Sequence, residues 1–292
     1  SIYGGVSSNK ITAIAGETST GKTYFSLAVV KNFLDTNPDG YCLYFDTEAA
    51  ITKGLLASRG IDQSRLVVVN VVTIEEFRSK ALRAVDIYLK TEEDNRKPCM
   101  FVLDSLGMLS TEKEIRDALD DKQVRDMTKS QLVKGAFRML TLKLGQANIP
   151  LIVTNHTYDV IGSYVPTKEM GGGSGLKYAS STIIYLSKKK EKSEKEVVGN
   201  IIKAKTVKSR LSKENKEVEI RLFYDERGLD RYYGLLELGE IGGLWQNKAG
   251  RYEMNGKKVF AKQILANPDD YFTPEVMQAL DEIAIKRFSY GN

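Results

Sequence analysis

The chain of 292 residues lacks the features that mark secreted and membrane proteins. It has two cysteines, Cys42 and Cys99, and each lies within a short apolar run. We expect both to be buried free thiols in a reducing compartment, not partners in a disulfide. The sequence has no leading signal-peptide pattern and no apolar run of membrane length. These absences predict a cytoplasmic protein without a membrane partner.

The net charge is also small, and histidine is rare. The formal net charge is +5, which is compatible with a nucleic-acid partner but does not by itself indicate one. His156 is the only histidine. The hydrophobic fraction of 42% and the charged fraction of 28% are ordinary for a globular protein, and the length allows one large domain and one small one.

What the sequence does contain is a phosphate-binding pattern near its start. Residues 11–15 predict a buried strand, and the apolar residues after Thr23 predict a helix. Between them stands the P-loop pattern, made of Gly16, Glu17, Thr18, Ser19, Thr20, Gly21, Lys22 and Thr23. The backbone N–H groups would surround the phosphates of a nucleoside triphosphate. Lys22 would reach the β- and γ-phosphates, and the Thr23 hydroxyl would bind Mg²⁺.

Two later apolar runs end in carboxylates. Residues 41–45 lead into Asp46-Thr47-Glu48, and residues 99–103 lead into Asp104. Open α/β sheets bind ligands at the carboxyl ends of their strands. Glu48 is therefore a candidate for the carboxylate that polarises an attacking water, with a solvated acidic loop as the alternative. Asp104 fits the Walker B position, which holds Mg²⁺ through water.

A further buried strand is predicted at residues 149–153, and it runs into Thr154, Asn155 and His156. A lone histidine is usually a structural hydrogen-bond donor. At this strand end, on the expected nucleotide side, it could instead sense a phosphate. Both interpretations stay open on the residues alone.

Several segments have weaker patterns. Residues 110–128 are polar, without a sustained apolar stripe, and predict a flexible loop or a solvated helix. Residues 157–175 have no secondary-structure pattern, which in a compact domain is typical of a functional or disordered loop. Residues 181–186 and 197–203 predict a hairpin, with the charged residues 188–196 as its solvated turn.

The character of the chain changes after Gly228. Turn signals become frequent, and Pro274 opens a helix for which Thr273 is the expected cap. We therefore expect an α/β core over residues 1–227 and a small C-terminal α+β lobe over residues 228–292.

The order of these motifs resembles the RecA-type recombinases, and especially their branch in T4-like phages. The order is P-loop, Phe-Asp-Thr-Glu, Leu-Asp-Ser, polar loop, Thr-Asn-His, glycine-rich loop and hairpin. The most specific phrases are Asn155-His156-Thr157-Tyr158 and Met170-Gly171-Gly172-Gly173. The resemblance covers nearly the whole chain. It implies a RecA-like P-loop NTPase core, in which helices flank a central, mostly parallel, twisted sheet.

The resemblance also implies roles at the nucleotide. Glu48 would be the catalytic glutamate, and His156 would sense the γ-phosphate and relay it to DNA. Lys203 and Lys205 would reach the γ-phosphate held by the neighbouring subunit, and Tyr224 would stack on the adenine. Leu55 stands where the family often has a second base-stacking tyrosine.

For DNA, the resemblance implies two binding loops, residues 110–128 and residues 157–174. The positions expected to contact DNA are Arg125, Lys129, Arg138, Lys168, Met170, Gly172 and Gly173. The chain opens at Ser1, just before the first expected strand, so we expect the family's N-terminal segment for subunit docking to be missing from it.

Taken as a whole, the resemblance implies a DNA-dependent ATPase that uses ATP and Mg²⁺. Its subunits would form a helical filament on single-stranded DNA, pair it with homologous double-stranded DNA, and exchange strands in recombination and repair. Mediator and single-strand-binding proteins would assist, in the host cytoplasm if a phage encodes the chain. Two alternatives stay open: a RecA-fold hexameric helicase, and a regulatory paralogue without strand exchange.

Overall fold

The computed structural model describes residues 5–121, 128–159, 168–171, 173–193, 196–225, 227–254 and 256–289. The chain divides into two compact units, Val6–Leu186 and a second unit formed mainly by Ser187–Asn292. The boundary falls within one strand, Thr182–Ser193 (β7). Arg125 and Gly172, both expected to contact DNA, lie outside the described residues.

The first unit is built on a mostly parallel sheet. Its strands are β1 (Ile11–Gly16), β2 (Tyr41–Asp46), β3 (Leu66–Asn70), β4 (Cys99–Asp104), β5 (Leu151–Asp159), β6 (Lys168–Met170) and the start of β7. The strand order is β3-β2-β4-β5-β1-β7, and these neighbours run parallel. Because the strands are parallel, β1, β2, β4 and β5 bring their carboxyl ends to one edge of the sheet.

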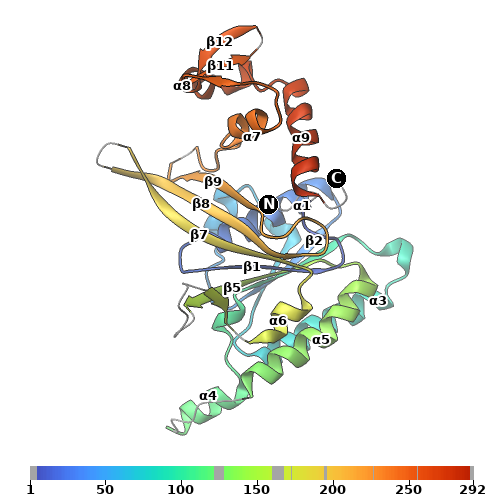
Figure 1. Ribbon diagram of the computed structural model, residues 1–292. Coiled ribbons are helices and arrows are strands. Elements are labelled where there is room, and N and C mark those ends of the chain that lie inside the picture. The colour runs from blue at the N-terminus through green and yellow to red at the C-terminus, as the bar shows by residue number, and fades with distance from the viewer. Residues whose placement is uncertain are drawn as a thin grey trace. The chain divides into compact units, whose positions relative to one another are not determined.

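Helices cover both faces of this sheet. They are α1 (Lys22–Thr36), α2 (Lys53–Ser58), α3 (Ile74–Lys90), α4 (Glu112–Leu119), α5 (Lys129–Ala147) and α6 (Ser174–Ala179). Short 3₁₀ turns lie at Gln63–Arg65, Glu93–Asn95 and Leu106–Met108. Figure 1 shows α3, α5 and α6 on one side of the sheet and α1 on the other. Burial on both faces explains why β1 and β4 are almost entirely apolar rather than alternating between apolar and polar residues.

An aromatic cluster joins the sheet to its helices. The ring of Phe45 on β2 lies 5.1 Å from that of Phe77 on α3 and 5.7 Å from that of Phe101 on β4. Phe77 in turn lies 6.4 Å from Phe137 on α5. The four side chains are almost fully buried, so they fix α3 and α5 against the strands that carry the carboxylates.

The two cysteines lie on adjacent strands of the same sheet. Both are buried free thiols, as expected. Burial raises the pKa of the Cys99 thiol to about 12 and also raises that of Cys42.

The expectation that residues 157–175 have no secondary structure is wrong for the described part. β5 continues to Asp159, Lys168–Met170 pairs with it as β6, and α6 begins at Ser174. A three-residue strand is too short for a sequence pattern, and only its partner stabilises it. In the polar stretch 110–128, residues 112–119 form the solvated helix α4. Its start is fixed by a capping box between Thr111 and Glu114 rather than by apolar packing.

The second unit begins with a long antiparallel ribbon. β7 is followed by β8 (Glu196–Ser209) and β9 (Glu217–Phe223), which are hydrogen-bonded in that order. The prediction of a solvated turn at residues 188–196 is therefore wrong, because most of this charged run lies in strands. Opposite charges on β7 and β9, the two strands that flank β8, compensate one another: Arg221 Nε lies 3.2 Å from Glu191 Oε1, and Lys189 Nζ lies 3.4 Å from Glu219 Oε1.

A small lobe follows the ribbon. Its elements are α7 (Leu235–Ile241), β10 (Asn247–Lys248), β11 (Arg251–Met254), β12 (Lys257–Phe260), α8 (Ala261–Ala266), the 3₁₀ turn Pro268–Asp270 and α9 (Pro274–Phe288). Thr273 caps α9, as expected, by accepting a hydrogen bond from the Val276 N–H. The core of the lobe is formed by Leu236, Trp245, Tyr252, Met254, Ile264, Phe272 and Leu280. This core supports the expected C-terminal lobe, whose boundary at residue 228 stays a prediction.

Among the described residues, no helix combines the length and the apolar character that crossing a membrane requires.

Candidate active site

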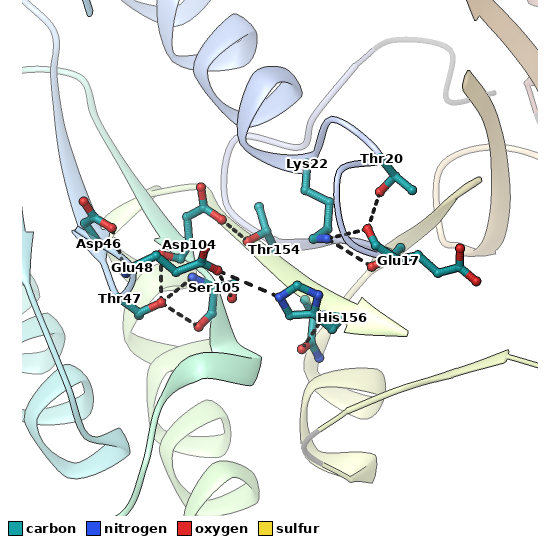
Figure 2. Close-up of polar contacts among 12 residues, drawn as sticks. Glu17, Thr20, Lys22, Asp46, Thr47, Glu48, Asp104, Ser105, Thr154 and His156 are labelled. Atoms are coloured by element: carbon teal, nitrogen blue, oxygen red, sulfur yellow. Dashed lines mark hydrogen bonds and ion pairs between the residues drawn. The ribbon is translucent and has the colours of Figure 1, made fainter. Parts of the chain in front are cut away.

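The P-loop connects the end of β1 to the start of α1. Gly21 precedes the helix in a left-handed conformation, with a φ of 88°, which a glycine adopts without strain. The Lys22 ammonium donates hydrogen bonds to the carbonyls of Gly16 at 3.0 Å and Glu17 at 2.9 Å. The Thr20 hydroxyl also donates to the Glu17 carbonyl, at 2.9 Å. The loop is therefore closed by its own side chains, with the lysine inside it (Figure 2).

Gly16 is required by close packing. A Cβ at this position would lie 2.6 Å from the carbonyl oxygen of Leu186 on β7 and 2.6 Å from the hydroxyl oxygen of Thr20. Neither distance is acceptable for a carbon atom, and the Leu186 oxygen belongs to the backbone of the adjacent strand. The first glycine of the motif thus lets the loop leave the sheet beside β7.

Asp104 ends β4 and is held by two hydroxyl groups. The Tyr44 hydroxyl on β2 donates to Asp104 Oδ2 at 2.7 Å, and the Thr154 hydroxyl on β5 donates to Oδ1. Tyr44 also lies 3.0 Å from the hydroxyl of Ser26 on α1. Asp104 is only 6% exposed, so these bonds replace water and fix the orientation of the carboxylate.

Glu48 follows β2 on a turn that is bonded to the end of β4. The Thr47 hydroxyl lies 3.1 Å from the carbonyl oxygens of both Asp104 and Ser105, and it accepts the Ser105 N–H at 2.7 Å. Asp46 accepts the Glu48 N–H at 3.0 Å. The Glu48 carboxylate accepts the Ser105 hydroxyl at 3.1 Å, and its side chain remains 42% exposed. A fixed backbone therefore carries a carboxylate that water can reach.

His156, on β5, lies between the P-loop and Glu48 (Figure 2). Its Nε2 is 3.9 Å from Glu48 Oε1. Partial burial, and then the charge of Lys22, hold the pKa of His156 below its ordinary value of 6.5, while Glu48 acts in the opposite direction. At neutral pH the imidazole is therefore uncharged, so one ring nitrogen can donate a hydrogen bond and the other can accept one.

The strand end that carries His156 is tied to the glycine-rich segment. The carbonyl of His156 accepts the Gly171 N–H at 3.0 Å. The side chain of Asn155, which is fully buried, donates to the Gly171 carbonyl at 2.8 Å and accepts the His156 N–H at 2.9 Å. A shift of His156 along β5 would therefore be transmitted to Gly171 through short hydrogen bonds.

Both expected DNA loops end beside the start of α5. Thr128 is the residue before this helix, and it closes the first loop. At the end of the second loop, Gly173 packs on Ser130, because a Cβ there would lie 3.0 Å from the serine hydroxyl oxygen. Gly175 packs on the backbone of Lys134, which a Cβ would approach to 2.8 Å. The fold thus brings together the ends of two segments that are about forty residues apart in the sequence.

The basic residues expected at DNA differ in their surroundings. Lys168, on β6, pairs with Glu17 of the P-loop. Lys129 Nζ lies 3.7 Å from Glu114 Oε2 on α4. Arg138 is exposed on α5, and Met170 is half-buried opposite Thr157 in the β5–β6 pair.

Lys203, Lys205 and Tyr224 belong to the second unit. Both lysines pair with Glu217 on β9, Lys205 at 3.7 Å, and the hydrogen bond to Glu217 raises the pKa of Lys203. Tyr224 is 61% exposed, and its hydroxyl donates to Asn200 Oδ1 at 3.2 Å. Within this unit the three side chains lie on the β8–β9 ribbon or at its end.

The comparisons agree with this geometry. A family model of the RecA N-terminal domain matches residues 2–230. The chain belongs to the RecA family. The recombination and repair protein of Enterobacteria phage T4 is 34% identical over 252 residues, which make up 86% of this chain and 62% of the phage protein. The RecA protein of Cereibacter sphaeroides is 27% identical over 258 residues, which make up 88% of this chain and 71% of that protein.

A third relative of the family, the RecA protein of Paracoccus denitrificans, is 27% identical over 274 residues, or 91% of this chain and 73% of that protein. The chain thus spans less than two thirds of the phage protein and somewhat more of the bacterial ones. The RecA-type resemblance and the mostly parallel α/β core predicted from the motifs are both confirmed.

Sequence reasoning missed the residues that orient this RecA-family site. Tyr44 and Thr154 hold Asp104, and Thr47 and Ser105 connect the ends of β2 and β4. A signal for the first two existed, because each is a hydroxyl residue in or directly after a buried apolar run. Their partner Asp104, however, lies on another strand, and no local sequence pattern identifies it.

Proposed function

We propose that this chain is the core of an ATP-dependent DNA recombinase, which forms filaments on single-stranded DNA and carries out homologous pairing and strand exchange. One observation carries the proposal. Glu48 and His156 lie together at the P-loop, and His156 is hydrogen-bonded through its backbone to the glycine-rich segment expected to bind DNA. A nucleotide site and a DNA site would thus share one strand end.

The P-loop would hold the triphosphate of ATP. Lys22 would exchange the carbonyls of Gly16 and Glu17 for phosphate oxygens, which are stronger partners for an ammonium group. Bound Mg²⁺ would neutralise charge on the phosphates. Its protein ligands would be the Thr23 hydroxyl and, through water, Asp104. Among the described residues, no group of three or more acidic, histidine or cysteine side chains is placed to hold a metal ion by itself, so phosphates and water would complete the shell.

Glu48 would act as the general base. Its carboxylate is accessible to water, and the Ser105 hydroxyl holds one oxygen, which leaves the other available for a water proton. His156, uncharged at neutral pH, would donate a hydrogen bond to the γ-phosphate. Movement of His156 would then shift Gly171 and the second DNA loop, so that ATP and DNA would favour each other's binding.

The neighbouring subunit would complete the site. Lys203 and Lys205 would leave Glu217 for the γ-phosphate across the interface, and Tyr224 would stack on the adenine. These roles rest on the family, as do double-stranded DNA, mediator proteins and single-strand-binding proteins as partners, and the cytoplasm as the location. Binding to the DNA backbone would be largely independent of sequence and would weaken with salt.

Electron microscopy tests the proposal. The chain is mixed with single-stranded DNA and a non-hydrolysable ATP analogue, and Lys22→Ala protein serves as the control. Helical filaments that form with the analogue, and not with the control variant, are the expected result. Closed rings would instead support a hexameric helicase. DNA binding without any assembly would support a regulatory paralogue.

ATP turnover provides a second test. Phosphate release is measured with and without single-stranded DNA at fixed salt. We expect DNA to raise the rate several-fold, because it would stabilise the state in which both DNA loops and the nucleotide are held. A rate that does not respond to DNA would contradict a DNA-dependent ATPase.

A further inference from the structure

The C-terminal lobe has a pocket on the outer face of its small sheet. The pocket has a volume of about 620 Å³ and is lined by Leu244, Trp245, Lys248, Arg251, Lys258 and Phe260, among others. This volume lies within the usual range of ligand pockets, roughly 300–1,000 Å³. All of these residues lie beyond residue 230, where the match to the RecA N-terminal domain ends.

The two faces of this sheet differ sharply. On β11, Tyr252 and Met254 point into the core of the lobe, whereas Arg251 and Glu253 are exposed. In the antiparallel register, Arg251 is opposite Phe260 and Glu253 is opposite Lys258 on β12. The strands therefore place four residues on a face that nothing in the described part of the chain covers.

Apolar surface is available in this pocket. Phe260 is 44% exposed and Leu244 is 40% exposed, and the mostly buried Trp245 lines the same pocket. The Arg251 guanidinium lies over the Phe260 ring at 4.6 Å. A planar cation on an aromatic face is a common element of protein recognition sites.

The pocket is also positively charged. Lys248, Arg251 and Lys258 contribute cations, and Glu253 contributes the single carboxylate. Within the described ranges, no carboxylate forms an ion pair with any of these three cations. They can therefore pair with an acidic ligand without first breaking an ion pair.

Hydrogen bonds hold the walls in place. The Trp245 indole N–H donates to the carbonyl of Leu236 at 2.9 Å. Asn247 donates to the Tyr252 hydroxyl at 3.0 Å and accepts the Gly250 N–H at 2.9 Å, which fixes the turn between β10 and β11. A ligand would thus bind a preformed surface, and the protein itself would lose little conformational entropy on binding.

We propose that this pocket binds an acidic peptide segment of a partner protein, with an aromatic or aliphatic side chain seated against Phe260 and Leu244. Charge complementarity selects the class of partner: acidic side chains would pair with Lys248, Arg251 and Lys258. The peptide's backbone N–H groups would donate to Glu253. A DNA backbone fits less well, because it has no donors and would meet Glu253 with repulsion alone.

Trp245 makes the proposal directly measurable, because it is the only tryptophan of the chain and it lines the pocket. The whole chain is titrated with a short aspartate-rich peptide that has one central phenylalanine, and tryptophan emission is recorded. We expect a saturable change with a Kd on the order of 10 µM. The same peptide with asparagines in place of aspartates should bind at least about tenfold more weakly.

Two lysine variants provide a matched pair. Lys258→Glu should weaken binding of the acidic peptide about tenfold, because it reverses a charge in the pocket. Lys262→Glu makes the same change at an exposed position on α8 outside the pocket and should leave the affinity within about twofold. Phe260→Ala should also weaken binding, since it removes the apolar seat.

Three results would overturn the proposal. One is no change in emission up to about 1 mM peptide, which is weaker than a specific site would bind. Another is equal affinity for the acidic and the neutral peptide. The third is a response of Trp245 to single-stranded or duplex DNA that Lys258→Glu abolishes while the peptide gives none, which would assign the pocket to nucleic acid. None of these readouts depends on ATP turnover or filaments.

Discussion

Charged and polar groups are held in two different ways in the two units. In the first unit, Asp104 and Asn155 are buried at strand ends, and their oxygens accept hydrogen bonds from neighbouring groups. In the second, Lys203, Lys205 and Glu217 pair across the surface of an antiparallel ribbon. Buried networks are strong and have one geometry, whereas exposed ion pairs are weak and exchange partners readily.

The difference indicates which unit holds its polar side chains in a fixed geometry and which unit lets them exchange partners. A carboxylate that must hold a metal ion at a fixed place belongs in the first kind of surroundings. A lysine that must leave one partner for another belongs in the second. The five substitutions below, together with one change of pH, test these two cases and are ordered from the largest expected effect to the smallest.

Lys22→Ala should have the largest effect. It removes the charge at the centre of the P-loop, so ATP turnover should fall about a thousandfold or more. Turnover is measured as the rate of phosphate release. Lys31→Ala, which removes an exposed lysine paired with Asp35 on α1, is the control and should retain turnover. Normal turnover in the Lys22→Ala variant would refute the P-loop assignment.

Glu48→Gln should lower turnover about a hundredfold, because the amide keeps the shape of the side chain but loses its basicity. Binding of ATP and of DNA should persist, as measured by fluorescence anisotropy. Glu92→Gln, at an exposed position far along the sequence, should change nothing. If Glu48→Gln turns over at the wild-type rate, the general base is another residue.

His156→Ala should abolish the effect of ATP on DNA affinity. In the wild type we expect DNA to bind roughly 5- to 150-fold more tightly with an ATP analogue than with ADP, and this ratio should fall close to one. His156→Gln, which keeps a hydrogen-bond donor, should restore part of it. A variant ratio equal to that of the wild type would leave His156 a structural donor only.

A lower pH should also change the contribution of His156 to the stability of the fold. The pKa of His156 is below its ordinary 6.5 in the folded state, because burial and Lys22 disfavour its protonation. Its contribution to stability is therefore complete above pH 6.5 and is lost as the pH falls from there, since the unfolded chain takes up the proton first. The difference in the free energy of unfolding between the wild type and His156→Gln, measured with urea, should thus stay constant above this pH and change only below it.

Tyr44→Phe should lower the free energy of unfolding by about 1–3 kcal/mol, because it leaves Asp104 Oδ2 buried without its donor. Urea denaturation measures it. Tyr158→Phe removes a hydroxyl from a tyrosine that is mostly exposed and should have almost no effect. Equal stability of Tyr44→Phe and wild type would mean that the network around Asp104 is not rigid.

The double change Lys203→Ala/Lys205→Ala should have the smallest effect on stability, with a urea midpoint close to that of the wild type, because the ion pairs to Glu217 are exposed. Turnover should nevertheless fall. Mixing this protein with Lys22→Ala protein should recover some turnover. The double variant would supply Lys22, and the Lys22→Ala protein would supply Lys203 and Lys205. No recovery in confirmed mixed assemblies would argue against a site shared between subunits.

The sequence predicted the parts of the site that depend on local order. Lys22 and Thr23 are identified by a motif within eight residues, and Glu48, Asp104 and His156 by their place after apolar runs. It did not predict that Tyr44 and Thr154 orient Asp104, because these partners are 60 and 50 residues away in the chain. Such pairings are decided by the strand order, which no local pattern contains.

The same reason explains the wrong predictions about β6 and the charged run. β6 exists because β5 offers it hydrogen bonds, and its three residues have no alternation to detect. The charged residues near the β7–β8 turn predict a solvated segment, but Glu191 pairs with Arg221 on another strand. In both cases the stabilising partner is distant in the sequence.

The crowding at Gly16 has a consequence for the history of the chain. Its lack of a side chain is demanded by the Leu186 backbone and by Thr20, whether or not a nucleotide is present. Selection for folding alone would therefore preserve the first glycine of the motif. A descendant that lost ATP binding could change Lys22 while it still had to keep Gly16. A substitution of Lys22 would therefore indicate lost activity, whereas a retained Gly16 would indicate only that the sheet is intact.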